Sequence, residues 1–207
     1  MHDGHHDHEP AGKREHDAPL SDYQRMEIAV RELLIEKGVL TAEDIRRTIE
    51  AMDARSPALG ARVVARAWTN PEFKARLLAN GTAACEEAGV EMGPTKLVVV
   101  ENTAEIHNLV VCTLCSCYPR SLLGLPPDWY KGRAYRARAV REPRQVLKEF
   151  GLTLSDKINL RVHDSTADMR YMVLPARPAG TEGWSEERLA GIVTRDCMIG
   201  VAVPRVA

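Results

Sequence analysis

The segment Cys112-Thr-Leu-Cys-Ser-Cys117 places three thiols within six residues, in the spacing Cys-x-x-Cys-x-Cys. A thiolate is a soft, strong metal ligand, so three thiolates held this close together can bind one ion. The apolar, β-branched stretches 96–101 and 106–111 before the motif are typical of strands, and Pro119 after it favours a turn. We therefore expect the cysteines on a tight turn at the end of a buried strand, a usual place for chemistry in an α/β scaffold.

Three kinds of site are compatible with this motif. A redox pair or disulfide would leave one thiol over and suits an exported protein, and we see no export signal in the sequence. A zinc site needs further ligands, whereas Cys85 and Cys197 stand alone and only His107 is near in sequence. In the third kind, a low-spin transition metal is held by three sulfurs and by the adjacent amide nitrogens of Ser116 and Cys117. Two nitrogens and two sulfurs would form a plane with the third sulfur axial, and one position would stay open for substrate.

The surroundings of the motif favour the third kind. The chain reads Val111-Cys-Thr-Leu-Cys-Ser-Cys-Tyr-Pro119, followed by Leu123-Gly-Leu-Pro-Pro127 and Trp129-Tyr-Lys131. This run closely resembles the metal-binding alpha subunit of the nitrile hydratase family, and the resemblance covers most of the chain from about Gly38 onward. In that family, threonine at the second motif position goes with cobalt and serine goes with iron. Thr113 therefore implies one non-corrin Co(III) per chain, with Fe(III) less favoured.

The resemblance implies a metal set of Cys112, Cys115, Ser116 and Cys117. It implies that Cys115 is oxidised to a sulfinate and Cys117 to a sulfenate, both of which lie on the ordinary thiol oxidation ladder. The sulfur oxygens would accept hydrogen bonds from arginines, expected largely from a partner subunit. The implied reaction is hydration of a nitrile to an amide, with Co(III) acting as a Lewis acid on the nitrile nitrogen.

We take Cys115, Cys117, Arg120 and Asp164 as candidate catalytic residues. From the sequence alone, Asp164 and Asp168 could do acid–base work as a carboxylate pair, or could form surface ion pairs with nearby arginines. The resemblance implies that Asp164 belongs to the surroundings of the metal ligands. At Asp168 the chain departs from the family, which usually has Glu there.

The residues after the motif do not decide between a nitrile and thiocyanate as the substrate. Most nitrile hydratases have Trp after the Tyr-Pro pair, whereas this chain has Arg120, and Ser121 replaces the usual Pro. The gamma subunit of thiocyanate hydrolase, a close relative with the same cobalt motif, carries Arg there and takes part in converting thiocyanate to carbonyl sulfide and ammonia. An arginine beside the metal would favour an anionic substrate. Segment 98–111 matches nitrile hydratase without the insertion expected in the relative, so we prefer the nitrile. The non-enzyme alternative is a zinc-stabilised interaction module.

A basic run follows the motif. It could bind nucleic acid, bind carboxylates at a subunit interface, or form a solvated face of mixed charge. Nucleic acid is the least favoured, because aromatic residues do not interleave with the run beyond Trp129, Tyr130 and Tyr135. The resemblance implies that Tyr135, Arg136 and Arg138 support the metal site. The run comprises Lys131, Arg133, Arg136, Arg138, Arg141, Arg144 and Lys148.

The first part of the chain reads as helical after a polar tail. Residues 1–19 hold His2, His5, His6, His8 and His16, as a solvated tail or as a metal-scavenging one that delivers cobalt. Cap and stop signals predict helices over 21–37, 41–54, 56–68, 70–81 and 82–88. We expect residues 1–55 to form a tail and a long helical arm that embraces a partner, and 56–207 the metal-binding catalytic domain. An ordinary helical subdomain of the same core is the alternative to the arm.

The rest of the chain alternates between strands and helices. Strands are predicted at 96–101, 106–111, 158–163 and 169–174, and helices at 128–141, 143–150 and 185–193, with 198–203 as a possible further strand. This is a mixed α/β or α+β pattern, and the resemblance implies the layered alpha-chain fold of the family.

Composition limits the partners and the compartment. A net charge of −1 gives no general attraction to nucleic acid or to a membrane, and no apolar run is long enough to span one. Five cysteines that look unpaired fit a reducing compartment, so we expect a cytoplasmic protein. The resemblance implies a beta-type partner subunit in an αβ, α2β2 or larger assembly, acting on a small nitrile or on thiocyanate.

Overall fold

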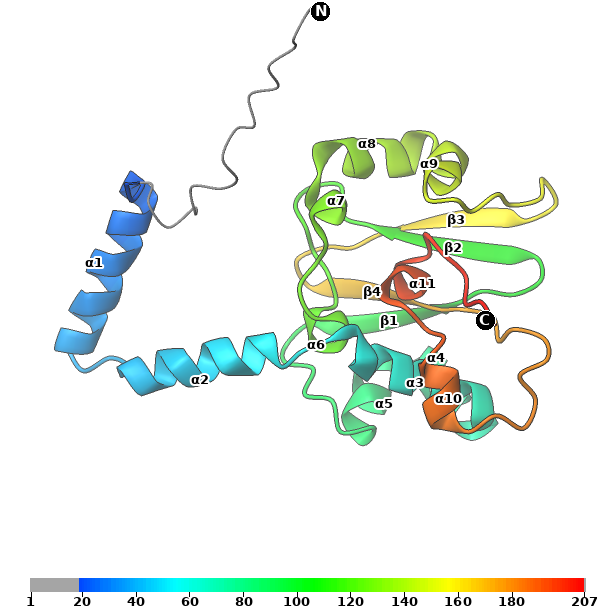
Figure 1. The fold of residues 1–207 in the computed structure, drawn as a ribbon, viewed down its shortest axis with the longest axis horizontal. Coiled ribbons are helices and arrows are strands. Elements are labelled where there is room, and N and C mark those ends of the chain that lie inside the picture. The colour runs from blue at the N-terminus through cyan, green and yellow to red at the C-terminus, as the bar shows by residue number, and fades with distance from the viewer. Residues whose placement is uncertain (1–18, 207) are drawn as a thin grey trace, which may run out of the picture. The chain divides into compact units, whose positions relative to one another are not determined.

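The structure is a computed structural model that describes residues 19–206. The predicted histidine-rich tail lies outside the described residues except for Pro19. The chain divides into two compact units, residues 1–49 and 50–207, and each is described by itself (Figure 1). The predicted domain boundary near residue 55 stays a prediction.

The helices of the first unit begin at the predicted cap residues. The side chain of Ser21 accepts a hydrogen bond from the Gln24 amide, and the Gln24 side chain accepts one from the Ser21 amide, so a capping box starts α1 (Asp22–Glu36). Thr41 and Asp44 exchange side-chain-to-amide hydrogen bonds in the same way at the start of α2 (Ala42–Asp53), which ends in the second unit. Local sequence alone is therefore enough to fix both helix starts.

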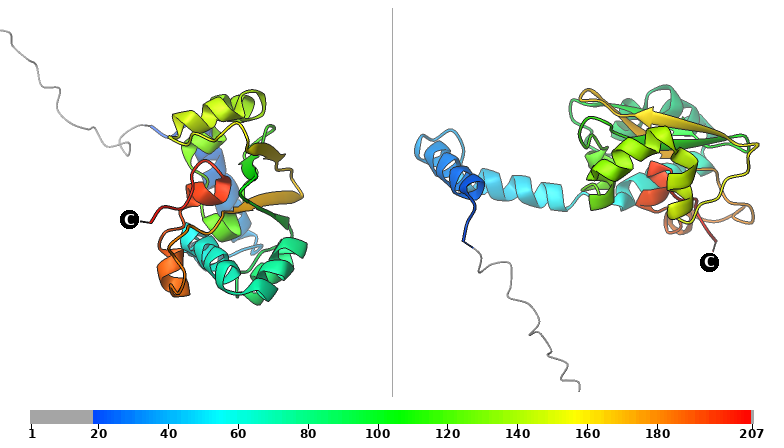
Figure 2. Two further views of the ribbon diagram at one scale, coloured as in Figure 1. Left: turned by 90° about the vertical axis from the view of Figure 1, so that its right-hand side faces the viewer. Right: turned by 90° about the horizontal axis from the view of Figure 1, so that it is seen from above.

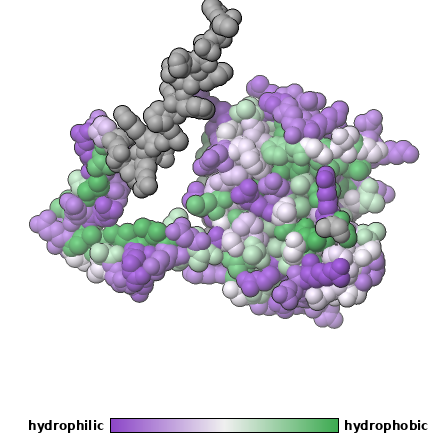
Figure 3. All heavy atoms as spheres, in the orientation of Figure 1, coloured by the Kyte–Doolittle hydropathy of each residue, from purple (hydrophilic) through white to green (hydrophobic). Residues whose placement is uncertain are grey.

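Apolar side chains of the first unit remain uncovered. No residue of α1 is buried, and Tyr23, Met26 and Val30 are more than half exposed. A groove of about 510 Å³ runs between α1 and α2, with a mostly apolar lining, and Figure 3 shows apolar side chains gathered on these two helices. The apolar side chains of α1 are therefore exposed, which is unusual for a chain that functions alone.

Four strands form the centre of the second unit. β1 (Lys96–Glu101) pairs in parallel with β4 (Met169–Leu174), and β2 (Ile106–Val111) pairs in parallel with β3 (Asn159–Asp164). All four predicted strands are confirmed to within one residue. The register places Val111 opposite Asp164, so the end of β2, where the cysteine motif begins, lies beside the end of β3.

Helices pack around these strands (Figures 1 and 2). The helices α4 and α5 contact β1, and α3 contacts α4 and α10; α8 contacts β2, α9 contacts β3, and α11 contacts β2 and β4. Valine, leucine and methionine side chains from these elements fill one core, which confirms the mixed α+β class. The helix bounds are α3 (Pro57–Thr69), α4 (Pro71–Ala79), α5 (Gly81–Glu87), α6 (Arg120–Leu123), α7 (Asp128–Lys131), α8 (Arg133–Arg141), α9 (Pro143–Glu149), α10 (Glu186–Ala190) and α11 (Arg195–Ile199).

Two predicted elements are wrong. The helix over 128–141 is interrupted at Gly132, whose backbone is extended (ψ 137°), so it forms α7 and α8. The possible strand at 198–203 is not formed: Thr194 caps α11 by accepting from the Cys197 amide, and Gly200 ends it in the left-handed region (φ 93°). A side chain at Gly200 would lie 2.0 Å from the Asn108 carbonyl oxygen, so the apolar run packs on β2 as a helix end.

None of the helices in residues 19–206 combines the length and the apolar character that crossing a membrane requires.

Candidate metal centre

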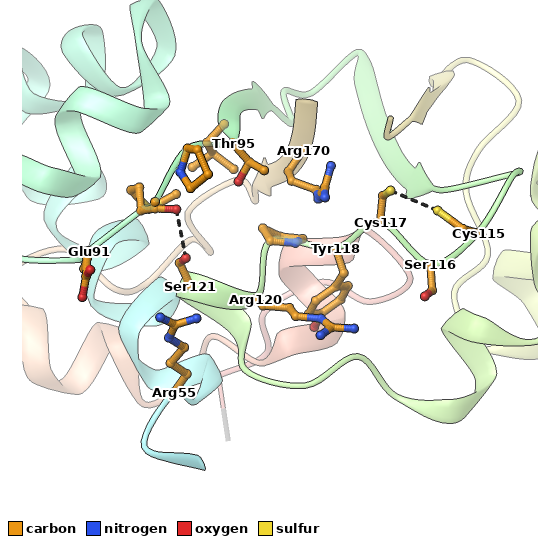
Figure 4. A pocket seen from close by; sticks show the side chains of 15 residues that line it. Arg55, Glu91, Thr95, Cys115, Ser116, Cys117, Tyr118, Arg120, Ser121 and Arg170 are labelled. Carbon is orange, nitrogen blue, oxygen red and sulfur yellow. Dashed lines mark hydrogen bonds between the residues drawn. The ribbon is translucent and has the colours of Figure 1, made fainter. Parts of the chain in front are cut away.

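The segment Cys112–Cys117, called the claw below, begins where β2 ends. Cys112 is buried, Cys117 is partly buried and Cys115 is exposed. The Sγ atoms of Cys112 and Cys115 lie 3.5 Å apart, and those of Cys115 and Cys117 lie 3.1 Å apart (Figure 4). All three sulfurs lie within 4.8 Å of one another, the one such cluster of three or more His, Cys, Asp or Glu ligand atoms in the part of the chain that the structure describes. The predicted tight turn at the end of a buried strand is confirmed.

The sulfur spacing distinguishes between coordination geometries. Two sulfurs bound to one metal at about 2.3 Å lie about 3.8 Å apart in a tetrahedron, and about 3.3 Å apart on adjacent corners of a square or octahedron. The distances of 3.5 and 3.1 Å bracket the second value. Both distances are shorter than the tetrahedral value, and no fourth His, Cys, Asp or Glu joins the thiols within residues 19–206 to complete a zinc site.

Backbone amides converge on the same sulfurs. The Cys115 amide donates to the Cys112 Sγ over 3.3 Å. Hydrogen bonds from Cys117 and Cys112, together with the amides of Ser116 and Cys117, lower the pKa of the Cys115 thiol to about 7. Burial, and then the neighbouring thiols, raise the pKa of Cys117 to about 12. Of these two thiols, Cys115 therefore ionises more easily.

Asp164 holds the start of the claw. Its carboxylate accepts a hydrogen bond from the Thr113 amide over 2.9 Å and another from the Thr113 hydroxyl over 2.6 Å. The Ser165 amide donates to the Val111 carbonyl over 2.7 Å, which fixes the adjoining residues. Asp164 forms no ion pair with Arg161 or Arg170 in the described chain and instead clamps the claw backbone, whereas its catalytic role stays a prediction.

Two tyrosines and an arginine donate hydrogen bonds to backbone carbonyls of the claw and of the strand before it. The Tyr130 hydroxyl donates to the Cys117 carbonyl over 2.8 Å, and the Tyr135 hydroxyl donates to the Val110 carbonyl over 2.6 Å. The Arg136 guanidinium reaches the Thr113 carbonyl over 3.5 Å. The implied support by Tyr135 and Arg136 therefore has a structural counterpart, whereas Arg138 pairs with Glu142 and Glu149 at the surface.

Tyr130 is the supporting residue that sequence reasoning missed. It is completely buried and forms edge-to-face contacts with Tyr118 and Trp129. The aromatic residues of the basic run thus contribute to the core, rather than to a surface platform. The available signal was the aromatic pair Trp129-Tyr130 one residue after two prolines, since a buried tyrosine usually directs its hydroxyl to a hydrogen-bond partner.

A pocket of about 470 Å³ adjoins the claw. Cys115, Ser116 and Cys117 line one end of it, and Arg120 lines the wall between them and Ser121 (Figure 4). The Ser121 hydroxyl donates to the Met92 carbonyl over 3.2 Å, which ties α6 to the loop before β1. The sequence prediction that Arg120 reaches the surroundings of the thiols agrees with this placement, and its role stays a prediction.

The other candidate ligands have structural roles. The His107 Nε2 donates to the Gly200 carbonyl over 2.7 Å, and its Nδ1 lies 3.3 Å from the Asn102 side-chain nitrogen. Cys85 and Cys197 are buried. Burial raises the pKa of Cys85 to about 12, which keeps this thiol protonated and poorly suited to binding a metal.

Comparisons with known proteins agree with this site. Residues 21–202 match the family described as nitrile hydratase, alpha chain. The low-molecular weight cobalt-containing nitrile hydratase subunit alpha of Rhodococcus rhodochrous is 54% identical over 178 residues, covering 85% of this chain and 86% of that protein. The thiocyanate hydrolase subunit gamma of Thiobacillus thioparus is 48% identical over 198 residues, covering 90% of this chain and 82% of that protein. A solved structure of recombinant thiocyanate hydrolase with partially modified cobalt centres matches with a TM-score of 0.85 and 47% identity, covering 90% of this chain and 92% of that one.

Proposed function

The chain belongs to the nitrile hydratase alpha-chain family, and we propose on that basis that it is the metal-binding catalytic subunit of a cobalt-dependent nitrile hydratase, which converts nitriles to amides. The observation that carries the proposal is the cluster of three sulfurs, all within 4.8 Å of one another, at one end of a pocket. Cobalt-containing relatives support Co(III) as the metal. We propose one ion per chain.

The metal ligands would be the sulfurs of Cys112, Cys115 and Cys117 and the amide nitrogens of Ser116 and Cys117. When bound, Co(III) would supply Lewis acidity that makes the nitrile carbon electrophilic toward water. The protein's part is positioning: Asp164 holds the Thr113 amide and hydroxyl, and Tyr130 holds the Cys117 carbonyl. Both clamps hold the claw backbone in a form that brings the three sulfurs together.

We further propose that Cys115 becomes a sulfinate and Cys117 a sulfenate. Cys115 is the exposed thiol and ionises more easily than Cys117, which are the two properties that favour oxidation. The sulfur oxygens would lie beside Arg170, whose positive charge already favours the Cys117 thiolate. Mass spectrometry of the claw peptide from the cobalt-loaded protein tests this: the expected additions are two oxygens on Cys115 and one on Cys117, and an unmodified peptide contradicts it.

A beta-type partner subunit would cover the exposed apolar faces. The groove between α1 and α2 and the side chain of Leu114, which is 86% exposed at the tip of the claw, both need cover. We therefore propose an αβ, α2β2 or larger assembly, in which residues 1–55 form the arm and 56–207 the catalytic domain. The five free cysteines favour a cytoplasmic location. A stable, active monomer in sedimentation would contradict the assembly.

The deciding experiment compares two cysteine variants of the assembled protein. Cys115→Ala should lose cobalt, the visible sulfur-to-metal absorption and amide formation together. Cys85→Ala, which removes a buried thiol far from the claw, should keep all three. Stoichiometric cobalt and full turnover in Cys115→Ala, or a colourless wild-type protein with one zinc, would overturn the proposal.

Thiocyanate hydrolysis is the second candidate function. Arg120 lines the pocket beside the claw, and its side chain has no hydrogen bond or ion pair with any of residues 19–206, so its charge is available to an anion. The gamma subunit of thiocyanate hydrolase is nearly as similar to this chain as the nitrile hydratase subunits are. Assaying the assembled protein with an aliphatic nitrile and with thiocyanate separates the two candidates.

A further inference from the structure

The pocket beside the claw has a second end that the proposed reaction does not use. Figure 4 shows Cys115, Ser116 and Cys117 at one end, and Arg55, Glu91 and Ser121 at the other. Arg120 and Arg170 lie between the two ends. The volume of about 470 Å³ is in the range that holds ligands of drug size, roughly 300–1,000 Å³. Thiocyanate has three atoms and would fill only a small part of it.

The lining of the pocket has a net positive charge, and none of its arginines forms an ion pair within residues 19–206. Three guanidinium groups line the pocket, from Arg55, Arg120 and Arg170, against one carboxylate, from Glu91. Arg170 donates to the carbonyls of Thr166 and Ala167. The Arg55 side chain, by contrast, has no hydrogen bond or ion pair with any of residues 19–206, and it is only partly exposed. A partly buried guanidinium without a partner is poised to bind an anion.

The second end is also held in place by the fold. Gly124, at the end of α6, has φ of 69°, and a side chain there would lie 2.5 Å from the Arg55 carbonyl oxygen. The backbone of Arg55 therefore packs directly on the helix that carries Arg120. On the opposite side, the Ser121 hydroxyl holds the Met92 carbonyl. Arg55 thus lies on a supported part of the chain, which lowers the entropic cost of ordering a ligand there.

We propose that the pocket binds nitriles carrying a carboxylate remote from the cyano group, with the cyano end at the claw and the carboxylate at Arg55. The planar guanidinium matches a carboxylate with two parallel hydrogen bonds, which gives orientation as well as attraction. Neutral apolar and hydroxyl groups, from Leu97, Pro94 and Thr95, line part of the space between and suit a methylene chain. This inference rests on the proposed nitrile hydratase function and names its substrate class.

The test uses the assembled, cobalt-loaded enzyme and two substrates of equal chain length, a cyanocarboxylate and an uncharged nitrile. The wild type should prefer the cyanocarboxylate in kcat/KM by about tenfold or more. Arg55→Gln should lose that preference mainly through KM, by about ten- to a hundredfold, and should leave the uncharged nitrile unaffected. Arg62→Gln is the matched control, because Arg62 is an exposed arginine on α3 that does not line the pocket.

A binding measurement makes the test independent of turnover. Saturation-transfer NMR on the assembled protein without cobalt, with an alkane carboxylate as the probe, should give a signal in the wild type and in Arg62→Gln but not in Arg55→Gln. Equal preference for the two substrates in the wild type, or equal losses on both in Arg55→Gln, would overturn the inference. So would loss of the assembly in Arg55→Gln, since Arg55 would then pair with the partner subunit. If no nitrile is hydrated but the NMR signal depends on Arg55, the proposed function fails and the carboxylate site remains.

Discussion

The hydroxyl of Tyr130 donates a hydrogen bond to the carbonyl oxygen of Cys117 over 2.8 Å, from a side chain that is completely buried. Burial also raises the pKa of this tyrosine, so the hydroxyl stays protonated and remains a donor. The last residue of the claw is thereby attached to α7, an element that contributes no ligand. Tyr118, whose ring lies 5.1 Å away, is equally buried, but its hydroxyl has no partner within the described chain.

The two tyrosines therefore predict opposite outcomes. Tyr130→Phe leaves the Cys117 carbonyl without its donor, at a cost of about 1–3 kcal/mol, and should lower cobalt retention. Tyr118→Phe removes only an unpaired hydroxyl and should be neutral or slightly stabilising. Thermal unfolding and cobalt content per chain measure both effects. Equal losses in the two variants would mean that the tyrosines matter only as core residues.

Substitutions at Asp164 and at Asp168 should also have different effects on stability and on cobalt retention. Asp164→Asn keeps one acceptor for Thr113 but places an NH2 group against its second donor, so the claw loosens. We expect roughly 1–3 kcal/mol of destabilisation and a faster loss of cobalt to a chelator. Asp168 is exposed, and Asp168→Asn should behave like the wild type. Similar chelation rates for the two variants would contradict the role of Asp164 as a clamp.

Arg120 should set the charge preference close to the metal. Arg120→Trp should raise kcat/KM for larger neutral nitriles and lower any activity on thiocyanate, by about ten- to a hundredfold, because it replaces a charge with an apolar wall. Arg120→Gln separates charge from size, since it should lower thiocyanate turnover without favouring bulky nitriles. If both substrates respond equally to Arg120→Trp, Arg120 does not face the substrate.

His107 predicts how stability depends on pH. Burial lowers the pKa of His107 below its ordinary value, and the hydrogen bond to Gly200 opposes this shift only in part. The Asn102 oxygen accepts from the Asn108 amide and side chain, so the Asn102 nitrogen must face Nδ1, where a second proton would meet a donor. The folded protein therefore resists protonation of this ring.

Proton linkage gives the direction in which the unfolding free energy changes with pH. Below about pH 6.5 the unfolded chain takes up a proton that folded His107 refuses, so the unfolding free energy should fall by up to about 1.4 kcal/mol per pH unit, down to the folded pKa. Above pH 6.5 His107 should contribute no dependence. Denaturant titrations at several pH values should show a shallower acid slope for His107→Gln than for the wild type, and parallel slopes would contradict the prediction.

The strands, the claw and most helix starts follow from local sequence. Ser21, Thr41 and Asn70 cap their helices with their own side chains, and β2 ends in the apolar run Leu109-Val-Val111. Signals of this kind act over a few residues, so a single sequence is enough to show them. The chemistry of the claw is local for the same reason, since its three sulfurs lie within six residues.

The contacts that position the claw act over long distances and could not be predicted. Asp164 accepts a hydrogen bond from Thr113 across 51 positions in the sequence. The Tyr130 hydroxyl contacts the Cys117 carbonyl only because α7 folds back onto the claw. The apolar run at 198–203 has the local pattern of a strand. It is buried instead as a helix end, because Gly200 packs on Asn108, 92 positions earlier. In each case tertiary packing decides the outcome, and local pattern carries no information about it.

The nesting of the two parallel strand pairs also determines when the site can form. β2 and β3 pair inside the segment that β1 and β4 enclose, and Tyr130, Tyr135, Asp164 and Ser165 all follow the claw in the chain. At about 5–20 residues per second, the ribosome needs several seconds after Cys117 to reach Asp164. The claw is thus translated before the residues that hold it. A claw clamped by Asp164 can form only after β3 has been translated.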